Sequence, residues 1–208
     1  MGHPLIHTPR IIEPESVIEL RAFVREHGTP SPPAAAEEGE INVLLAPDEA
    51  LHNLMSDLSV HICQLADSLW LDAHVVWHGS IREWQPGEYA TSHFDCYDVN
   101  DGAPVLMDGL QQRYCDLSCV LFLSDSEGDG ILQFPEQGVD IKPVAGTAAL
   151  FPATIPHQVS TVEKERLTMV FFLSRARTLG LTAPILPDGW QNQLYHPSRA
   201  EFLAQTLG

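Results

Sequence analysis

Long apolar runs are absent from this chain of 208 residues, and basic residues are scarce. No stretch approaches the roughly 18 consecutive apolar residues of a membrane-spanning helix, so we expect no membrane partner. The first twenty residues carry Pro4, Pro9, Pro14 and acidic groups but no apolar signal-peptide core, so we expect no signal peptide. The 28 acidic residues outnumber the 11 basic ones and give a net charge of −17. Such a surface repels phosphate backbones and anionic lipid, which argues against a nucleic-acid partner.

Cysteine is also rare, with four residues at positions 63, 96, 115 and 119. They form no C-x-x-C pair and no zinc-finger spacing, so a zinc site built from thiolates is not indicated. We interpret them as reduced thiols of an intracellular, cytoplasmic protein. The hydrophobic fraction of 44% is ordinary for a globular protein, and the length suits a single domain over 1–208 with a sizeable core.

The N-terminal part, 1–73, predicts helical support for whatever follows. Residues 14–27 read as a helix that ends at Gly28 in a left-handed conformation, and 29–40 read as a proline- and alanine-rich linker. Residues 41–45 read as a short strand. A second helix is indicated by apolar residues that recur at three- and four-residue steps: Leu51, Leu54, Met55, Leu58, Ile62, Leu65 and Leu69. His52 and His61 lie off this stripe, which favours surface histidines.

Short strand patterns dominate from His74 to Arg177, with Gly, Pro, Asp and Asn turns between them. This pattern indicates an antiparallel sandwich or barrel over 74–177, with mainly β structure flanked by helices. Residues 178–208 predict an irregular extension with a short helix, because Ser198 and Glu201 form a capping box. The expected strands are 75–77, 80–84, 117–123, 131–134, 148–151 and 167–173.

One pair of side chains within this β-rich part can bind a metal ion. His93 and Asp95 are two residues apart, and in a strand such side chains point to the same face. An imidazole and a carboxylate so placed can share an ion with a third ligand from another strand. Two nitrogens and one oxygen on one face of an octahedron suit iron(II), whereas zinc more often takes three histidines or thiolates. A lone His-x-acid match is expected by chance in a chain with ten histidines, so its context decides.

That context extends over residues 75–175. The segment Trp84-Gln85-Pro86-Gly87-Glu88-Tyr89 precedes His93, and Gly130-Ile131-Leu132-Gln133-Phe134-Pro135 follows it. Further along lie Ala149-Leu150-Phe151-Pro152, then His157-Gln158-Val159, then Arg166 nine residues beyond the histidine. With these motifs in this order, the chain resembles the prolyl 4-hydroxylase-like branch of the 2-oxoglutarate- and iron(II)-dependent oxygenases.

The resemblance implies a double-stranded β-helix, the jelly-roll or cupin-like fold, packed against the N-terminal helices. It implies that His93, Asp95 and His157 hold Fe(II) and that Arg166 pairs with the far carboxylate of 2-oxoglutarate. A guanidinium suits this role because it forks onto a carboxylate with two hydrogen bonds. Thr168 lies on the same strand face as Arg166 and can add a hydroxyl donor. O2 is the implied co-substrate, and ascorbate is a candidate reductant.

The chain departs from the family pattern at three positions. The tyrosine expected nine residues before the first histidine is Trp84, so its hydrogen bond in the pocket is lost or is supplied by Tyr89. The first glycine of the following hairpin is Asp129, and a second tyrosine found in some members corresponds to Phe122. Lys164 is the nearest competitor of Arg166 for the co-substrate carboxylate. The retained carboxylate at position 95 argues against halogenating variants, which need that coordination position for chloride.

Substrate contacts are assigned to four further residues: Arg82, Trp84, Tyr97 and Arg113. The alternative for both arginines is a surface ion pair that contributes little to stability. We expect a dioxygenase that hydroxylates an unactivated C–H bond of a small molecule, such as a free amino acid or natural-product intermediate, with succinate and CO2 as co-products. The alternatives are a prolyl hydroxylase acting on protein or peptide, and a cupin-like metalloenzyme or binding module that does not use 2-oxoglutarate. The sequence leaves the oligomeric state open.

Overall fold

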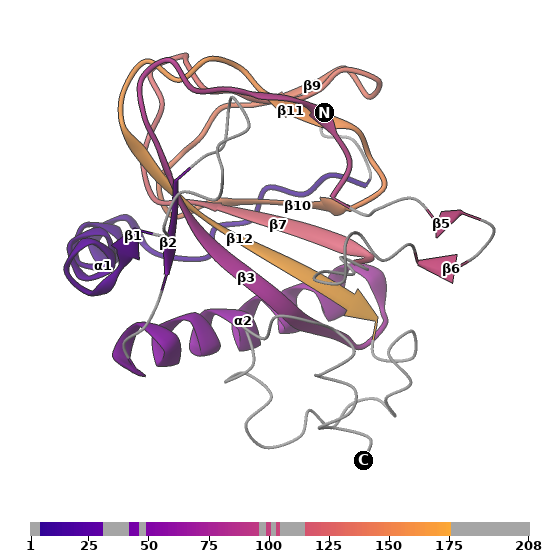
Figure 1. Ribbon diagram of the computed structural model, residues 1–208. Helices are drawn as coiled ribbons and strands as arrows, with labels where there is room; N and C mark the ends of the chain where they lie inside the picture. Colours follow the sequence, from indigo (N-terminus) through magenta and orange to yellow (C-terminus); the bar gives the residue numbers. More distant parts are fainter. Residues whose placement is uncertain are drawn as a thin grey trace.

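Two antiparallel sheets and two helices make up the main body of the protein (Figure 1). The computed structural model describes residues 5–30, 42–45, 49–95, 99–100, 103–104 and 115–175. The larger sheet has the order β1-β2-β3-β12-β7-β10, and the smaller has the order β4-β11-β8-β9. The two-residue strands β5 (Val99–Asn100) and β6 (Ala103–Pro104) pair with each other.

The larger sheet is built around its longest strands. Its members are β1 (Thr29–Pro30), β2 (Asn42–Leu45), β3 (His74–Trp84), β7 (Leu117–Phe122), β10 (Ala148–Pro152) and β12 (Arg166–Arg175). Strand β12 lies between β3 and β7, and its residues are buried from Arg166 to Ser174. A strand covered on both faces cannot show the alternation of polar and apolar residues that marks a half-exposed strand, and β12 accordingly reads as an almost continuous apolar run.

The two faces of β12 meet different partners because successive side chains of a strand point to opposite sides. Leu167, Met169, Phe171 and Leu173 belong to the core between the sheet and the helices. The alternate residues face the smaller sheet, and three of them (Arg166, Thr168 and Val170) line a cavity there. A single strand therefore supplies both the main core and one wall of the cavity.

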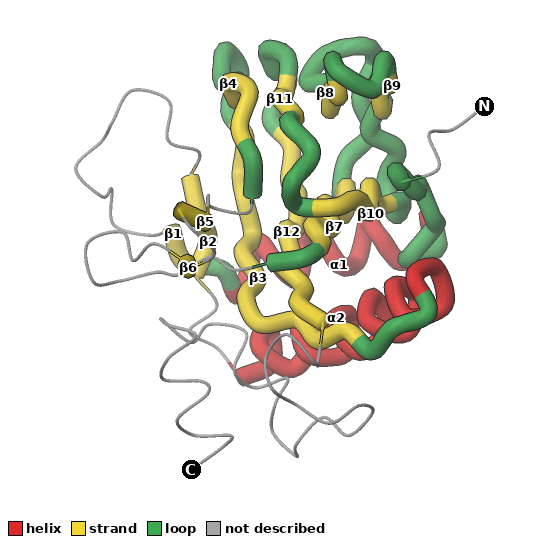
Figure 2. Tube along the Cα trace, turned by 90° about the vertical axis from the view of Figure 1, so that its right-hand side faces the viewer, coloured by secondary structure: helices red, strands yellow, loops and turns green. Residues whose placement is uncertain are grey.

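The helices cover the outer face of the larger sheet, as Figures 1 and 2 show. Helix α1 (Pro14–His27) buries Val17, Leu20 and Val24, and α2 (Glu49–Trp70) buries Met55 and Ile62, all in the core shared with the sheet. The predicted stripe of α2 thus packs on the sheet, and His61 is exposed as expected. Neither helix in the described part of the chain combines the length and apolar character that crossing a bilayer requires.

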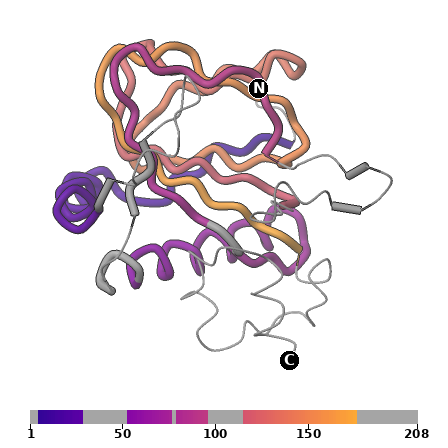
Figure 3. The backbone as a smooth tube through the Cα atoms, viewed as in Figure 1, coloured from indigo at the N-terminus to yellow at the C-terminus, as the bar shows by residue number. Residues whose placement is uncertain are grey.

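The smaller sheet lies on the opposite side of the larger one (Figures 2 and 3) and contains β4 (Ala90–His93), β8 (Leu132–Phe134), β9 (Val139–Ile141) and β11 (His157–Val159). A strand through His93 and Asp95 was expected, but β4 ends at His93, and β9 and β11 were not among the expected strands. Residues 75–77 and 80–84 were expected as separate strands but form the single strand β3.

Several expectations are confirmed, and others need correction. The helix over 14–27, the second helix and the mainly β architecture with flanking helices are as predicted. Gly28 does not take a left-handed conformation, since its φ is −78°. Thr29–Pro30 belongs to a short strand paired with β2 instead of a linker. The rest of the 29–40 linker and the 178–208 extension lie outside the described residues, and the single-domain organisation over 1–208 stays a prediction.

An N-terminal segment before α1 extends the larger sheet beyond β10. His7 and Leu150 exchange backbone hydrogen bonds of 2.9 and 2.8 Å, and the N–H groups of Ile11 and Ile12 both donate to the carbonyl of Gly146. Gly146 has a φ of +83°, and a Cβ there would lie 2.1 Å from the carbonyl oxygen of Ile12. This close approach requires glycine, whereas Gly138, with a φ of +62°, has open space around it.

We expect Gly146→Ala to destabilise the protein more than Gly138→Ala does. Both substitutions force an alanine into a left-handed conformation, which costs about 1–2 kcal/mol. Only the first also drives a methyl group into the backbone of the N-terminal segment. Urea unfolding of the two variants measures the difference in the free energy of unfolding. Equal losses would show that the N-terminal segment moves aside without cost.

Candidate metal centre and cavity

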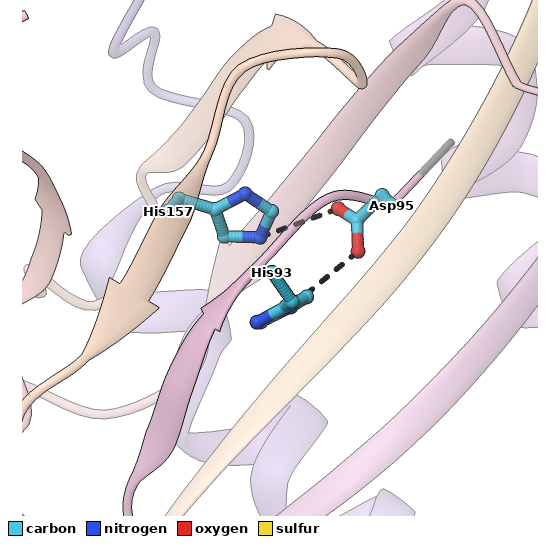
Figure 4. Close-up of side chains that lie close together, drawn as sticks. All are labelled: His93, Asp95 and His157. Carbon is cyan, nitrogen blue, oxygen red and sulfur yellow. Dashed lines mark ion pairs between the residues drawn. The ribbon is translucent and has the colours of Figure 1, made fainter. Parts of the chain in front are cut away.

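Three side chains from two strands and a bend converge at one point between the sheets. His93 ends β4, His157 begins β11, and these two residues are directly paired in the antiparallel ladder. The Asp95 carboxylate lies beside both imidazoles, with one oxygen 3.7 Å from His93 Nε2 and the other 3.4 Å from His157 Nε2 (Figure 4). One donor atom from each residue lies within 4.8 Å of the others, near enough for a single ion to bind all three.

Both histidines are oriented by a hydrogen bond to the backbone carbonyl two residues earlier in the chain. His93 Nδ1 lies 2.7 Å from the carbonyl oxygen of Thr91, and His157 Nδ1 lies 3.1 Å from that of Ile155. A carbonyl oxygen only accepts hydrogen bonds, so each ring carries its proton on Nδ1 and donates it there. Each Nε2 then offers a lone pair toward the carboxylate. Fixing the tautomer through the second ring nitrogen is the usual way proteins orient a metal-binding histidine.

Aromatic packing keeps His157 neutral. Its ring centroid lies 4.8 Å from that of Phe151 and 5.9 Å from that of Phe134, and the residue is 4% exposed. Burial lowers the pKa of His157 below its usual value, although the charge of Asp95 opposes this shift. Neutral imidazole is the form that binds metal ions, so this environment favours the ligand form.

Asp95 reaches the histidines by a route that differs from the predicted one. Strand β4 ends at His93, and Asp95 lies in a bend after it, not two residues along a continuous strand. Its backbone N–H donates to the carbonyl of Ala153 at 3.2 Å, and its carbonyl accepts from the Cys115 thiol at 3.4 Å. These bonds hold the bend, and the carboxylate is 7% exposed. A buried carboxylate between two imidazoles is the 2-His-1-carboxylate donor set that suits iron(II).

The three residues form part of the wall of a cavity between the sheets, about 470 Å³ in size and partly open to solvent. Its remaining wall combines apolar side chains with a few polar ones, as small-molecule sites generally do. The polar or aromatic members contributed by β3 and β12 are Arg82, Trp84, Arg166 and Thr168. The apolar members are Ala90, Val120, Phe122, Leu132, Val159 and Val170.

Arg166 is a buried cation in this wall. It is 4% exposed, its Nη1 donates to the carbonyl of Gly130, and its guanidinium carbon lies 5.1 Å from the ring centroid of Trp84. Burial lowers the pKa of Arg166 to about 10, a shift that the charge of Asp129 opposes, so the side chain remains charged at neutral pH. Its Nε has no hydrogen-bond partner among the described residues. A buried charge with an unsatisfied donor calls for an anionic ligand.

Gly130 makes room for Arg166, and Asp129 fixes the turn before it. Gly130 has a φ of +52°, and a Cβ there would lie 2.3 Å from Arg166 Nη1. Asp129, which replaces the expected glycine, does not take a positive φ. Its carboxylate accepts from the N–H of Glu163 at 2.7 Å, and this bond most of all lowers the pKa of Asp129. Asp129 therefore stabilises the turn before Arg166. Gly130, whose lack of a side chain leaves space for the guanidinium, is retained.

Trp84 uses its one polar group inside the wall. Its Nε1 donates to the hydroxyl of Thr168 at 3.0 Å, and Trp84 and Arg166 are paired across the ladder. Phe122 is paired with Thr168 from the other side and is fully enclosed. Trp84 thus positions the hydroxyl of Thr168 and offers a ring to Arg166, but it has no further donor for a ligand.

Some predicted site residues are not brought together here. Tyr89 is 54% exposed and does not line the cavity, so it does not replace the missing tyrosine hydroxyl there. Lys164 is an exposed turn residue paired with Glu127 at 2.7 Å and does not line the cavity. Tyr97 and Arg113 lie outside the described residues.

Sequence reasoning missed the residues that orient the site. The carbonyls of Thr91 and Ile155 left no signal, because any residue has a carbonyl. The rings of Phe134 and Phe151 were visible in the quoted motifs but were not connected with His157. Gly130 belonged to the quoted hairpin. A glycine two residues before the buried strand β8 was the signal that could have identified it.

Sequence and structure comparisons place this site in a known context. A family model described as the 2OG-Fe(II) oxygenase superfamily matches residues 79–174. This range begins in β3 and ends in β12, so it contains the three candidate metal ligands and Arg166. No curated protein matches the chain.

Solved structures share the fold. An oxidoreductase of the 2OG-Fe(II) oxygenase family from Burkholderia pseudomallei is 17% identical, with 82% of this chain and 84% of that chain covered and a TM-score of 0.58. A Pseudomonas putida prolyl-4-hydroxylase is 22% identical, with coverage of 82% and 92% and a TM-score of 0.53. HygX from Streptomyces hygroscopicus, solved with nickel, 2-oxoglutarate and hygromycin B, is 15% identical, with coverage of 82% and 82% and a TM-score of 0.59. These likenesses confirm the predicted jelly-roll fold.

We expect His157→Ala to lower the affinity for iron(II) by more than about 100-fold, because changes in residues that only hydrogen-bond a metal ligand already cost about 10- to 100-fold. His61→Ala is the matched control, since His61 is exposed on α2 away from the cavity. Anaerobic iron(II) titration of both variants and the unmodified protein measures the effect. Equal affinities in all three would exclude His157 as a ligand.

Proposed function

We infer the reaction from one premise, that the chain belongs to the 2OG-Fe(II) oxygenase superfamily through residues 79–174. It is therefore a 2-oxoglutarate- and iron(II)-dependent dioxygenase. We propose that it hydroxylates a C–H bond of a small molecule. The observation that carries the proposal is the pairing of two features in one cavity: a His-Asp-His cluster and a buried arginine with an unsatisfied donor.

We propose His93, Asp95 and His157 as the iron ligands. Two neutral imidazole nitrogens and one carboxylate oxygen are a donor set that would suit iron(II). When bound, iron(II), 2-oxoglutarate and O2 supply the oxidising chemistry, with succinate and CO2 as co-products. Asp95 contributes the negative charge, and the Thr91 and Ile155 carbonyls keep both rings in the ligand tautomer.

Arg166 is proposed to bind the distal carboxylate of 2-oxoglutarate. Its Nη1 is held by Gly130, and its unsatisfied Nε leaves a donor available to a carboxylate. A charge-assisted pair inside a partly dry cavity is stronger than one on the surface. The hydroxyl of Thr168 accepts from Trp84, so its own hydrogen is available to the ligand. The apolar wall around these groups reduces their contact with water.

A small-molecule substrate is supported by the lining of the cavity, which combines apolar side chains with a few polar groups, as small-ligand sites do. HygX, which shares the fold, was solved with hygromycin B. A prolyl hydroxylase acting on peptides is the second candidate, and its support is the fold shared with the Pseudomonas putida prolyl-4-hydroxylase. The acidic surface supports the absence of a nucleic-acid partner.

A cytoplasmic location is also part of the proposal. The described cysteines, Cys63, Cys115 and Cys119, are free and buried, as in proteins of reducing compartments. Burial raises the pKa of the Cys63 thiol to about 12, which keeps it protonated and unreactive.

Gly130→Ala tests the place of Arg166. A methyl group at this position overlaps the guanidinium, so we expect the affinity for 2-oxoglutarate to fall by about 10- to 100-fold through loss of a charge-assisted pair. Gly128→Ala is the control, because Gly128 also has a positive φ but has open space around it. Calorimetric titration of the iron-loaded proteins with 2-oxoglutarate measures both. An equal affinity in the two variants would remove Arg166 from the proposed role. A lack of 2-oxoglutarate binding by the unmodified protein would favour a metalloprotein that does not use 2-oxoglutarate.

Succinate formation over a substrate panel tests the reaction itself. The panel contains free amino acids, other small metabolites and proline-containing peptides, each with iron(II), 2-oxoglutarate, O2 and ascorbate. We expect a small molecule to stimulate succinate formation above the rate without substrate. Stimulation by the peptides alone would favour the prolyl hydroxylase. No succinate under any condition, with no 2-oxoglutarate binding, would contradict the oxygenase activity.

A further inference from the structure

The side chain of Trp84 contacts two residues of β12 at once. Trp84 is paired with Arg166 in the antiparallel ladder, and its ring centroid lies 5.1 Å from the guanidinium carbon of that arginine. Its Nε1 extends diagonally to Thr168, two residues further along β12, and donates to the hydroxyl oxygen at 3.0 Å. All three side chains line the cavity, and none is more than 4% exposed. The indole therefore connects the two polar side chains that β12 contributes to the wall.

None of the described side chains paired with Thr168 or bonded to it can accept the hydrogen of its hydroxyl. An indole N–H only donates, so Thr168 is the acceptor in its bond with Trp84. Across the ladder Thr168 is flanked by Arg82, whose side chain has no acceptor atom, and by Phe122, whose side chain has no polar atom. Within the described part of the chain, the bond with Trp84 is the one hydrogen bond of this hydroxyl. Its hydrogen is thus left for a ligand in the cavity.

Arg166 and Thr168 together can bind one anion at two points. They are two residues apart in β12, so their side chains point to the same face and start about 7 Å apart along the strand. The Nε of Arg166 has no partner among the described residues. A carboxylate has two oxygens, and each of them needs a donor when it leaves water for an apolar wall. A guanidinium N–H and a hydroxyl, both held by one indole, can meet that need.

We propose that Trp84 is a positioning residue that sets the selectivity for the co-substrate: its N–H directs the hydroxyl of Thr168 to the carboxylate that Arg166 binds. This proposal rests on the proposed function and deepens it. It assigns to Trp84 an action through Thr168 instead of a direct substrate contact. Selection of a 2-oxo acid with a distal carboxylate then depends on the indole N–H, because without it the hydroxyl rotates freely and must be ordered on binding.

Calorimetric titration of the anaerobic, iron-loaded protein with two 2-oxo acids tests the proposal. 2-Oxopentanoate has the chain length and the 2-oxo acid group of 2-oxoglutarate, but a methyl group replaces the distal carboxylate. Trp84→Phe keeps a ring and loses the N–H. We therefore expect the affinity for 2-oxoglutarate to fall about 3- to 10-fold and the affinity for 2-oxopentanoate to stay unchanged. Trp70→Phe is the matched control and should change neither affinity, since Trp70 ends α2 beside His7, outside the cavity.

Thr168→Val supplies a second background that separates the hydroxyl from the ring. It removes the group that Trp84 orients. We therefore expect Trp84→Phe to change the 2-oxoglutarate affinity less in this background than in the unmodified protein. Thr168→Ser keeps a hydroxyl at this position and should hold the affinity near that of the unmodified protein. Thermal melting and iron(II) titration of every variant check that the fold and the metal site persist.

Three results would overturn the proposal. One is an equal loss of affinity for both 2-oxo acids in Trp84→Phe, which would show a merely structural role. The others are an equal effect of Trp84→Phe in both backgrounds and an unchanged 2-oxoglutarate affinity in Trp84→Phe. Failure of the unmodified protein to bind 2-oxoglutarate would instead contradict the proposed function.

Discussion

Burial of both faces of β12 is the constraint on which the rest of the structure depends. The strand is enclosed between β3 and β7, and its odd-numbered residues complete the core against the helices. Its even-numbered residues are then obliged to face the smaller sheet, whatever their polarity. Arg166 and Thr168 are polar side chains in positions where an apolar residue would stabilise the fold more simply. Thr168 satisfies the N–H of Trp84, whereas Arg166 keeps an unsatisfied Nε, which favours an anionic ligand in the cavity.

The surroundings of Arg166 show how the fold tolerates a charge without its ligand. Gly130 offers a carbonyl at a point where any side chain would collide with the guanidinium, and Trp84 offers the face of its ring. Asp129 supplies a negative charge, and its carboxylate also fixes the turn before β12. These contacts hold the cation in place but leave Nε without a partner in the described part of the molecule. The site is therefore organised before the ligand arrives, which reduces the entropy lost on binding.

The sequence predicted the fold class and the convergence of His93, Asp95 and His157. It predicted the strand bounds and the path of the chain to Asp95 less well. The 14–27 helix and the stripe of α2 were predictable because they repeat a period over many residues. Strand β11 was not among the expected strands, although it carries one histidine of the metal centre. A strand was expected at His93, but it ends there and does not continue to Asp95. Spacing linked His93 to Asp95 through a continuous strand, but tertiary hydrogen bonds to Ala153 and Cys115 bend the chain between them. Tyr89 was a reasonable replacement for a missing hydroxyl by distance along the chain, and only the three-dimensional arrangement shows it outside the cavity.

Charge inside the cavity and charge on the whole protein have opposite signs, and both shape ligand binding. With a net charge of −17, a dicarboxylate approaches a surface of its own sign, so long-range steering does not assist its capture. The attraction must arise within the cavity, where apolar walls exclude water and weaken screening. Arg166 and Arg82 both line it. An acidic exterior around a cationic cavity therefore selects for anions that fit between these groups, because only close contact overcomes the repulsion outside.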